Sequence, residues 1–273
     1  MNEGNLTSLY LRRNLMKVGV VGYGVVGKAM HKLFPDAAVY DEPLNIGERA
    51  EINSCDVSFV CVPSPMADDG SCDTSIVEDC LGWMESDVIV LRSTVPVGFT
   101  DAMVEKTGKH IVFQPEYLGE TVAHPFVDMS NRGWVSLGGE RYGVDKVIDL
   151  YHTVYNAYIE YHITDAKTAE LAKYMENSFY AVKVTFCNEM FDVAEAMGVD
   201  YNELREVWLA DPRICRSHTL VYRNKRGYSG KCLPKDTNAI IYQGNKLGVD
   251  MKLMESVREK NYIYHPELKK PTK

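Results

Sequence analysis

Short runs of β-branched and other apolar residues recur through the first half of the chain and predict the strands of one sheet. Segments of helix length separate the runs, which cover residues 17–21, 38–40, 56–62, 87–91, 110–113 and 133–137. Continuous apolar runs of this length are typical of parallel strands that are covered on both faces. Strands that alternate with helices predict a doubly wound parallel α/β sheet of the Rossmann type.

The pattern changes after Asp165, where apolar residues recur at alternating steps of three and four. These residues are Ala172, Met175, Phe179, Val182, Phe186, Met190, Val193 and Met197. Thr164 or Asp165 can cap a helix start and Gly198 can end the helix, which predicts one helix of about 32 residues over 166–197. A helix this long predicts the spine of a second, all-helical domain, and we expect it to pack against a partner subunit.

These patterns predict four segments in the chain. They are an N-terminal extension at 1–15, a Rossmann domain at 16–162, a helical domain at 163–265 and a tail at 266–273. The extension contains Arg12 and Arg13 but no apolar core of secretory length. No run approaches the ~20 apolar residues that a membrane span needs, so no membrane association is expected.

A glycine motif follows the first predicted strand directly. It reads Gly22, Tyr23, Gly24, Val25, Val26, Gly27, and a helical segment comes next. The second predicted strand ends in Asp41, nineteen residues after Gly22. Strand, glycines, helix and a following acid predict a dinucleotide site, with the phosphates at the helix N-terminus and Asp41 at a ribose hydroxyl. The acid favours NAD over NADP because it would repel a 2′-phosphate.

Polar, proline-bearing loops follow the third, fourth and fifth predicted strands, at 62–65, 93–98 and 114–120. Each loop alone can be explained as turn chemistry. The carboxyl ends of parallel strands meet at one edge of a sheet, however, and ligands collect there. Three such loops therefore predict a pocket at this edge.

The stretch 227–236, GYSGKCLPKD, is the most informative in the chain. Pro234 is well placed as the first residue of a helix, which puts the Cys232 thiol at a helix N-terminus beside Lys231 and Lys235. The helix dipole and these cations favour thiolate. The alternative is a buried, inert cysteine beside a capped helix.

Composition narrows the function classes. The chain has 273 residues, 45% hydrophobic and 25% charged, as in a soluble globular protein, and a net charge of −8 argues against non-specific nucleic-acid binding. Its seven cysteines show neither CxxC nor His/Cys metal spacing, so we expect a reduced, cytoplasmic setting and no metal site.

With these pieces in place, the chain resembles the UDP-glucose 6-dehydrogenase family of NAD-dependent nucleotide-sugar dehydrogenases, from residue 17 to about 261. Six motifs carry the resemblance in the family's order: GYGVVG, VPSP, STVPVG, QPEYLGE, ELAKYMEN and GYSGKCLPKD. The last resembles the family's GFGGSCFPKD. The resemblance implies oxidation of a sugar C6 alcohol to a carboxylate in two hydride transfers, with UDP-glucose or a similar nucleotide sugar as substrate and a homodimer formed through the long helix.

The resemblance also implies roles for individual residues. Cys232 is the expected nucleophile, Lys173 and Asn177 frame the C6 hydroxyl, and the water is held by Thr94, Glu116 and Asp236. The expected NAD-binding residues are Gly22, Tyr23, Gly24, Val25, Val26, Gly27, Asp41, Val62, Pro63, Ser64, Thr94, Glu120 and Lys235. The expected substrate-binding residues are Glu116, Tyr117, Leu118, Gly119, Glu120, Lys173, Asn177, Arg213, Tyr222, Tyr228 and Ser229.

The chain departs from the family pattern in three ways. The family's further nucleotide-binding domain is expected to be absent, Ser229 replaces a glycine, and Gly119 replaces an arginine. Contacts to a diphosphate would then come from another chain or from a local basic cluster, which can equally be a solvated loop. The cluster contains Arg216, His218, Arg223, Lys225 and Arg226.

Two other functions stay open on the sequence. A two-electron β-hydroxyacid dehydrogenase also has two domains and a Lys-x-x-x-Asn helix, but it has no use for a thiol at the position of Cys232. The second open function is that of a catalytically incompetent NAD-binding homologue, which would need a partner domain. Without context, Lys173 and Asn177 can also be a solvated helix face.

Overall fold

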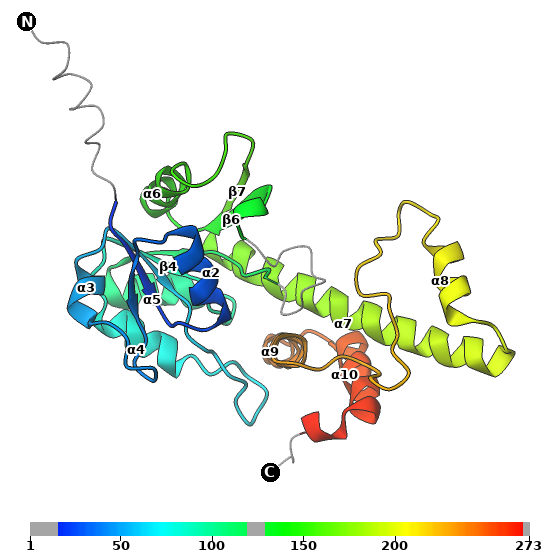
Figure 1. Ribbon diagram of the computed structural model, residues 1–273. Helices are drawn as coiled ribbons and strands as arrows, with labels where there is room; N and C mark the ends of the chain where they lie inside the picture. Colours follow the sequence, from blue (N-terminus) through cyan, green and yellow to red (C-terminus); the bar gives the residue numbers. More distant parts are fainter. Residues whose placement is uncertain (1–15, 119–128, 270–273) are drawn as a thin grey trace, which may run out of the picture. The chain divides into compact units, whose positions relative to one another are not determined.

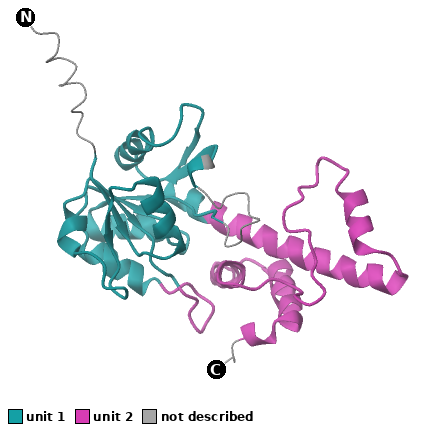
Figure 2. Cartoon of the chain, viewed as in Figure 1, with its two compact units in different colours: residues 1–64, 74–170 teal, residues 65–73, 171–273 magenta. Residues whose placement is uncertain are grey.

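The computed structural model describes residues 16–118 and 129–269, which divide into two compact units (Figure 2). The first unit comprises Met1–Ser64 and Thr74–Glu170, and the second comprises Pro65–Asp73 and Leu171–Lys273. The boundary between Glu170 and Leu171 lies inside the long helix. The limits of the predicted domains stay a prediction.

The first unit is built on a seven-stranded sheet with the order β2-β1-β3-β4-β5-β6-β7. The strands are β1 (Val18–Val21), β2 (Ala38–Tyr40), β3 (Val57–Val60), β4 (Val88–Leu91), β5 (His110–Phe113), β6 (Trp134–Gly138) and β7 (Glu160–Thr164). Strands β1 to β5 are parallel to one another. The sheet order reverses beside β1, which is the position where doubly wound sheets bind their ligands. The predicted Rossmann-type fold is confirmed.

Two details of the predicted sheet were wrong. Strand β6 was expected to be parallel, but it pairs with β5 in antiparallel orientation through Phe113 and Gly138. A parallel neighbour needs a long crossover, usually a helix, and between β5 and β6 the described residues contain only a 3-10 turn, η1 (Met129–Asn131). Strand β7 was not predicted; it pairs in parallel with β6 after α6 (Arg141–Tyr151).

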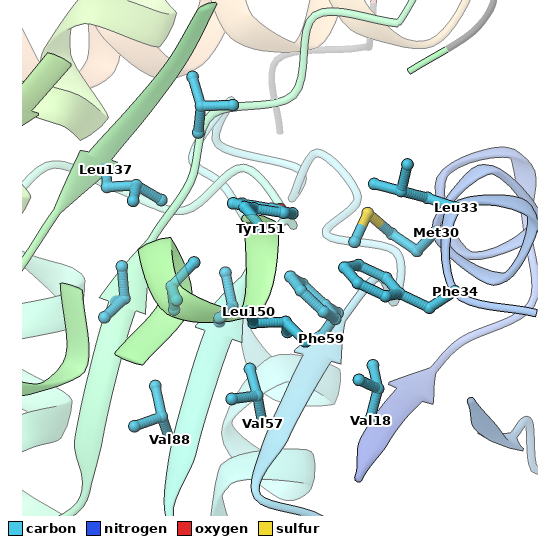
Figure 3. Packing of buried hydrophobic residues seen from close by; sticks show 14 of the residues in the cluster. Val18, Met30, Leu33, Phe34, Val57, Phe59, Val88, Leu137, Leu150 and Tyr151 are labelled. Carbon is cyan, nitrogen blue, oxygen red and sulfur yellow. The ribbon is translucent and has the colours of Figure 1, made fainter. Parts of the chain in front are cut away.

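Helices cover both faces of the sheet because its strand residues alternate between two apolar clusters. One cluster joins the sheet to α2 (Val25–Leu33) and α6, and the other joins it to α3 (Arg49–Asn53), α4 (Ser75–Trp83) and α5 (Phe99–Thr107). The rings of Phe34, Phe59 and Tyr151 lie together in the first cluster (Figure 3). The centroid of Phe34 lies 5.7 Å from that of Phe59 and 6.0 Å from that of Tyr151.

The second unit is helical. It contains most of α7 (Ala166–Met197) together with α8 (Tyr201–Trp208), α9 (Cys232–Lys246), α10 (Lys252–Tyr264) and the short η2 (Pro266–Leu268) (Figure 1). Helix α7 has 32 residues, as predicted. Asp165 caps it by accepting from the Thr168 amide at 2.9 Å, and Gly198 follows its last residue with φ +71°.

Helices α9 and α10 pack on α7 through a small apolar cluster. Its buried residues are Ala181 of α7, Tyr228 of the loop before α9, and Val257 of α10, and the partly buried Leu233 of α9 packs against them. Across the residues that the structure describes, no helix is both long and apolar enough to cross a membrane.

Candidate active site

The glycine motif forms a tight turn between β1 and α2. Gly22 has φ +90°, and a Cβ there would lie 2.9 Å from the Cys61 carbonyl. A Cβ on Gly27 would lie 1.8 Å from the Gly22 oxygen, whereas a Cβ on Gly24 would meet nothing within 4 Å. The turn and the helix therefore exclude side chains at Gly22 and Gly27, and the backbone at Gly24 is open to a ligand. Helix α2 begins after Gly24 without a side-chain cap, so its first N–H groups suit an anion.

Asp41 lies where the dinucleotide pattern requires an acid. Its Oδ2 accepts from the Tyr23 amide at 2.6 Å, and its Oδ1 accepts from the Leu44 amide at 2.9 Å. The Tyr23 hydroxyl lies 2.8 Å from His31 Nδ1 on α2. The Asp41 carboxylate thus stabilises the glycine turn by accepting from its Tyr23 amide.

The loops after β3 and β4 are joined by a side chain. Val62, Pro63 and Ser64 follow β3, and Thr94 follows β4. Ser93 donates from its hydroxyl to the Val62 carbonyl at 2.6 Å. Two of the three predicted polar loops are therefore adjacent at the carboxyl edge of the sheet.

The third loop contains an ion-pair cluster in place of an open carboxylate. Glu116 accepts from Arg92, whose side chain is fully buried, and lies 3.5 Å from Arg132, which is also buried. The amides of Tyr117 and Leu118 donate to the same carboxylate. Tyr117 is itself buried, and its ring lies 4.9 Å from that of Trp134. The predicted residues Gly119 and Glu120 lie outside the described residues.

In the second unit a buried polar chain joins α7 to α9. Lys173 Nζ donates to Asn177 Oδ1 at 3.3 Å, and Asn177 Nδ2 donates to Asp236 Oδ2 at 2.5 Å. Lys235 Nζ lies 2.6 Å from the other carboxylate oxygen of Asp236. All but Lys235 are buried, so Lys173 and Asn177 do not form a solvated helix face.

Cys232 is the first residue of α9 and is exposed. The helix begins two residues earlier than expected, because Pro234 is its third residue and not its first. The first four N–H groups of a helix have no intrahelical partner, so proline is tolerated there as well. Cys232 is therefore at a helix N-terminus, as predicted, and it is not buried as the alternative required. Its reactivity stays a prediction.

The predicted substrate loop gives a mixed result. Tyr222 and Ser229 are exposed, whereas Tyr228 is buried. Arg213 is exposed and pairs with its own neighbour Asp211 at 2.6 Å. The role of each in substrate binding stays a prediction.

Most of the basic cluster has partners inside the chain. Arg216 makes two hydrogen bonds to Glu206, at 2.8 and 2.6 Å. Arg223 pairs with Glu195 and Arg226 with Asp192, each at 2.7 Å. His218 stacks on Tyr180 with a centroid distance of 4.0 Å. These arginines fix the loop to α7 and α8, which weakens their assignment to a diphosphate.

The structure also brings buried charged residues to these loops that the sequence did not single out. Arg92 and Arg132 contact Glu116, and Glu170 contacts the turn after Thr94. A signal was present for two of them, since Arg92 directly precedes STVPVG and Glu170 opens ELAKYMEN. Within 16–118 and 129–269, no group of His, Cys, Asp or Glu residues is suited to hold a metal ion.

Comparison with known proteins agrees with this geometry. Residues 36–158 match the NAD binding domain of the UDP-glucose/GDP-mannose dehydrogenase family, and residues 167–262 match that family's central domain. UDP-glucose 6-dehydrogenase TuaD of Bacillus subtilis is 29% identical over 77% of this chain and 47% of its own length. GDP-mannose 6-dehydrogenase of Pseudomonas syringae pv. tomato is 30% identical over 77% of this chain and 51% of its own.

A solved structure supports the same assignment. The UDP-glucose dehydrogenase of Pyrobaculum islandicum superposes with a TM-score of 0.79 and 25% identity, over 92% of this chain and 69% of that one. The chain spans about half the length of the curated relatives named above. Because two models of one family match in order and together cover most of the sequence, the chain belongs to the UDP-glucose/GDP-mannose dehydrogenase family and contains its NAD binding and central domains.

Proposed function

We propose that this chain is an NAD-dependent nucleotide-sugar dehydrogenase that oxidises a sugar C6 alcohol to the carboxylate, with UDP-glucose or a similar nucleotide sugar as substrate. The observation that supports this most is the buried chain Lys173–Asn177–Asp236 beside a helix that begins at an exposed Cys232. A two-electron dehydrogenase needs the lysine and the amide but not the thiol. The thiol is what makes a second oxidation possible.

The first unit fits the cofactor. Gly24 leaves its surroundings open at the start of α2. Asp41, which accepts from the Tyr23 amide of the same turn, is the proposed acceptor for a ribose hydroxyl. Two NAD⁺ molecules, bound there one after the other, would supply the oxidising power: the first would accept a hydride from the alcohol and the second a hydride from the cysteine adduct. The surrounding residues bind and orient the cofactor: Gly22 and Gly27 permit the close turn, and Ser93 joins the Val62 loop to the Thr94 loop.

The residues of the second unit can supply the proton and nucleophile chemistry. Lys173 is the proposed base that takes the proton of the C6 hydroxyl. Asn177 orients Lys173, because its amide oxygen accepts from the lysine while its NH₂ group donates to Asp236. The cation and the amide can then stabilise the oxyanion that develops at each tetrahedral stage.

Cys232 carries the second half of the reaction. Its thiolate adds to the aldehyde carbon, the resulting thiohemiacetal loses a hydride, and a thioester remains. A water molecule then adds to the thioester, the C–S bond breaks, and the thiolate is released with the acid. Asp236 is proposed to hold that water, since each carboxylate oxygen keeps accepting capacity beyond its contact with Asn177 or Lys235.

A homodimer through α7 is part of the proposal. Along this helix, exposed apolar residues recur at steps of four and seven, which places them on one face: Leu171, Met175, Phe179, Phe186, Val193 and Met197. Met175 and Phe179 are 74% and 60% exposed. A continuous apolar stripe on a helix is self-complementary when two copies meet about a two-fold axis. Light scattering on Phe179→Glu, compared with the unaltered chain, tests it: loss of a dimer supports this interface, and an unchanged mass contradicts it.

A screen of sugar nucleotides tests the activity. The purified chain is incubated with NAD⁺ and, in turn, UDP-glucose, GDP-mannose and their N-acetylated analogues, and NADH is followed at 340 nm. We expect NADH formation with at least one sugar nucleotide. Binding of NAD⁺ in titration calorimetry, with neither binding nor turnover of any sugar nucleotide, would instead favour an NAD-binding homologue that needs a partner domain.

A further inference from the structure

Helix α5 begins without a cap of its own. Its N-cap residue is Gly98, which has φ +93° and no side chain to accept from the first turn. The first N–H groups of a helix have no partner within it. The Phe99 amide donates to the Pro96 carbonyl at 3.0 Å, which leaves other amides of this turn to be satisfied from elsewhere.

Glu170 supplies acceptors for these amides from the second turn of α7. Its Oε2 accepts from the Gly98 amide at 2.5 Å, and its Oε1 accepts from the Thr100 amide at 2.9 Å and the Thr100 hydroxyl at 2.6 Å. The Glu170 residue is fully buried, and this burial raises the pKa of its carboxyl group. Three donors and the positive end of a helix dipole offset the desolvation of the charge.

The start of α7 is packed closely against the first unit around this contact. A Cβ on Gly138 of β6 would lie 2.6 Å from the Ala169 Cβ, so the helix approaches the strand as closely as glycine permits. Lys167 lies on the exposed side, where its Nζ is 3.4 Å from Asp101 of α5. Residues 166–170 are thus fixed in the unit that contains Thr94.

The turn 93–98 is anchored at both ends. At its start the Ser93 hydroxyl donates to the Val62 carbonyl of the proposed cofactor loop. At its end Gly98 donates to Glu170. Thr94, a proposed water-holding residue, lies between these two anchors.

We propose that Glu170 is a positioning residue that fixes the Thr94 turn to the start of α7, the helix in which Lys173 follows Glu170 by one turn. This inference rests on the proposed function and deepens it, because it assigns the geometry of Thr94 to a carboxylate that does not touch the substrate. It predicts that the contribution of Thr94 to turnover depends on Glu170.

The direct test is amide hydrogen exchange, measured residue by residue on the full chain. Glu170→Gln keeps the size of the side chain but removes its charge and one acceptor. We expect the Gly98 and Thr100 amides to exchange about 10-fold faster or more, because a hydrogen bond to a charged group is stronger than one between neutral groups. Asp101→Asn, which alters the exposed contact between the same two helices, is the matched control and should leave these amides unchanged. Unchanged exchange in Glu170→Gln would overturn the inference.

The kinetic test is a double-mutant cycle between Glu170→Gln and Thr94→Ala. We expect Glu170→Gln to lower kcat about 10-fold, with the Kd for NAD⁺ changed less than 2-fold. In the Thr94→Ala background, Glu170→Gln should lower kcat less than 2-fold, since the side chain that Glu170 positions is already absent. Full additivity would overturn the positioning role.

Failure of this inference can be distinguished from failure of the proposed function. If the unaltered chain oxidises no sugar nucleotide, the proposed function fails, while amide exchange still decides the role of Glu170. If Glu170→Gln does not fold, Thr100→Val replaces it: this variant removes only the hydroxyl donor, and we expect a smaller increase in exchange at Gly98. No increase in that variant would count against the inference.

Discussion

Asn177 and Asp236, which are 59 positions apart in the chain, share a buried hydrogen bond of 2.5 Å between Nδ2 and Oδ2. The bond joins α7 to the second turn of α9, the helix that begins at Cys232. Asn177 uses its oxygen toward Lys173 and its NH₂ group toward Asp236. The Asn177 side chain therefore links Lys173, the proposed base, to the helix that begins with Cys232, the proposed nucleophile.

Replacing Asn177 should lower stability as well as turnover. Asn177→Ala leaves the buried Asp236 carboxylate without this donor, and an unsatisfied buried polar group costs about 1–3 kcal/mol. We expect a loss of that size in the free energy of unfolding, measured by urea denaturation. The exposed residue Asn224 provides the control, and Asn224→Ala should change the free energy by less than about 0.5 kcal/mol. Equal stability of the two variants would contradict the bond described here.

Cys232→Ser should separate the two oxidations. A serine at the N-terminus of α9 keeps the size of the side chain but is a far poorer nucleophile, so acid formation should fall on the order of 1,000-fold or more. Slow release of aldehyde can remain, and it is detected by trapping with a hydrazine. NAD⁺ affinity should be unchanged, because the residues proposed to bind the cofactor phosphates and ribose are in the first unit. Acid formed at the normal rate would remove Cys232 from the mechanism.

Asp41→Ala should weaken NAD⁺ binding and relax discrimination against NADP⁺. The carboxylate is expected to accept from the ribose, and a hydrogen bond to a charged group contributes about 1.5–3 kcal/mol, so the Kd for NAD⁺ should rise about 10-fold or more. Loss of the bond from the Tyr23 amide to Asp41 adds to this effect. Titration calorimetry with both cofactors measures the change. An unaltered preference would mean that the ribose is held elsewhere.

Glu116→Gln tests whether this residue is structural. The family resemblance implied a carboxylate that holds water, and the structure pairs this carboxylate with two buried guanidinium groups. Breaking a buried ion pair by removing one partner costs about 3–5 kcal/mol, so we expect a loss of that size on urea denaturation. Exposed Glu195 pairs with Arg223 at the surface, and Glu195→Gln is the matched control, with an expected loss of at most about 1 kcal/mol. A stable Glu116→Gln protein with impaired turnover would favour the water-holding role instead.

Regular patterns in the sequence predicted the regular parts of the fold. The apolar runs predicted β1 and β3 to β5, whose residues are almost all buried. The spacing of three and four predicted helix α7, and the capping residue Asp165 and the terminating Gly198 predicted its ends. Strand β7 escaped prediction because it is an edge strand of mixed and largely exposed residues. The direction of β6 was not predicted, because strand direction depends on the segment that connects β5 to β6 and not on the residues of the strand itself.

Several contacts of the site join residues that are far apart in the sequence, and local sequence patterns cannot predict such contacts. Adjacent motif positions predicted Cys232 at a helix N-terminus and Lys173 and Asn177 on one face. The partners of Glu116 and Glu170 could not be predicted in this way. Glu170 reaches Gly98 across 72 positions and Arg92 reaches Glu116 across 24, and the sequence of either partner alone does not indicate the other.

The number of NADH molecules formed for each sugar nucleotide consumed tests the central claim most directly. Absorbance at 340 nm gives the NADH, and chromatography of the nucleotide sugar gives the substrate consumed in the same sample. A second oxidation at the Cys232 sulfur predicts two NADH for each acid produced. One NADH for each substrate, with aldehyde or ketone as the final product, would contradict the account.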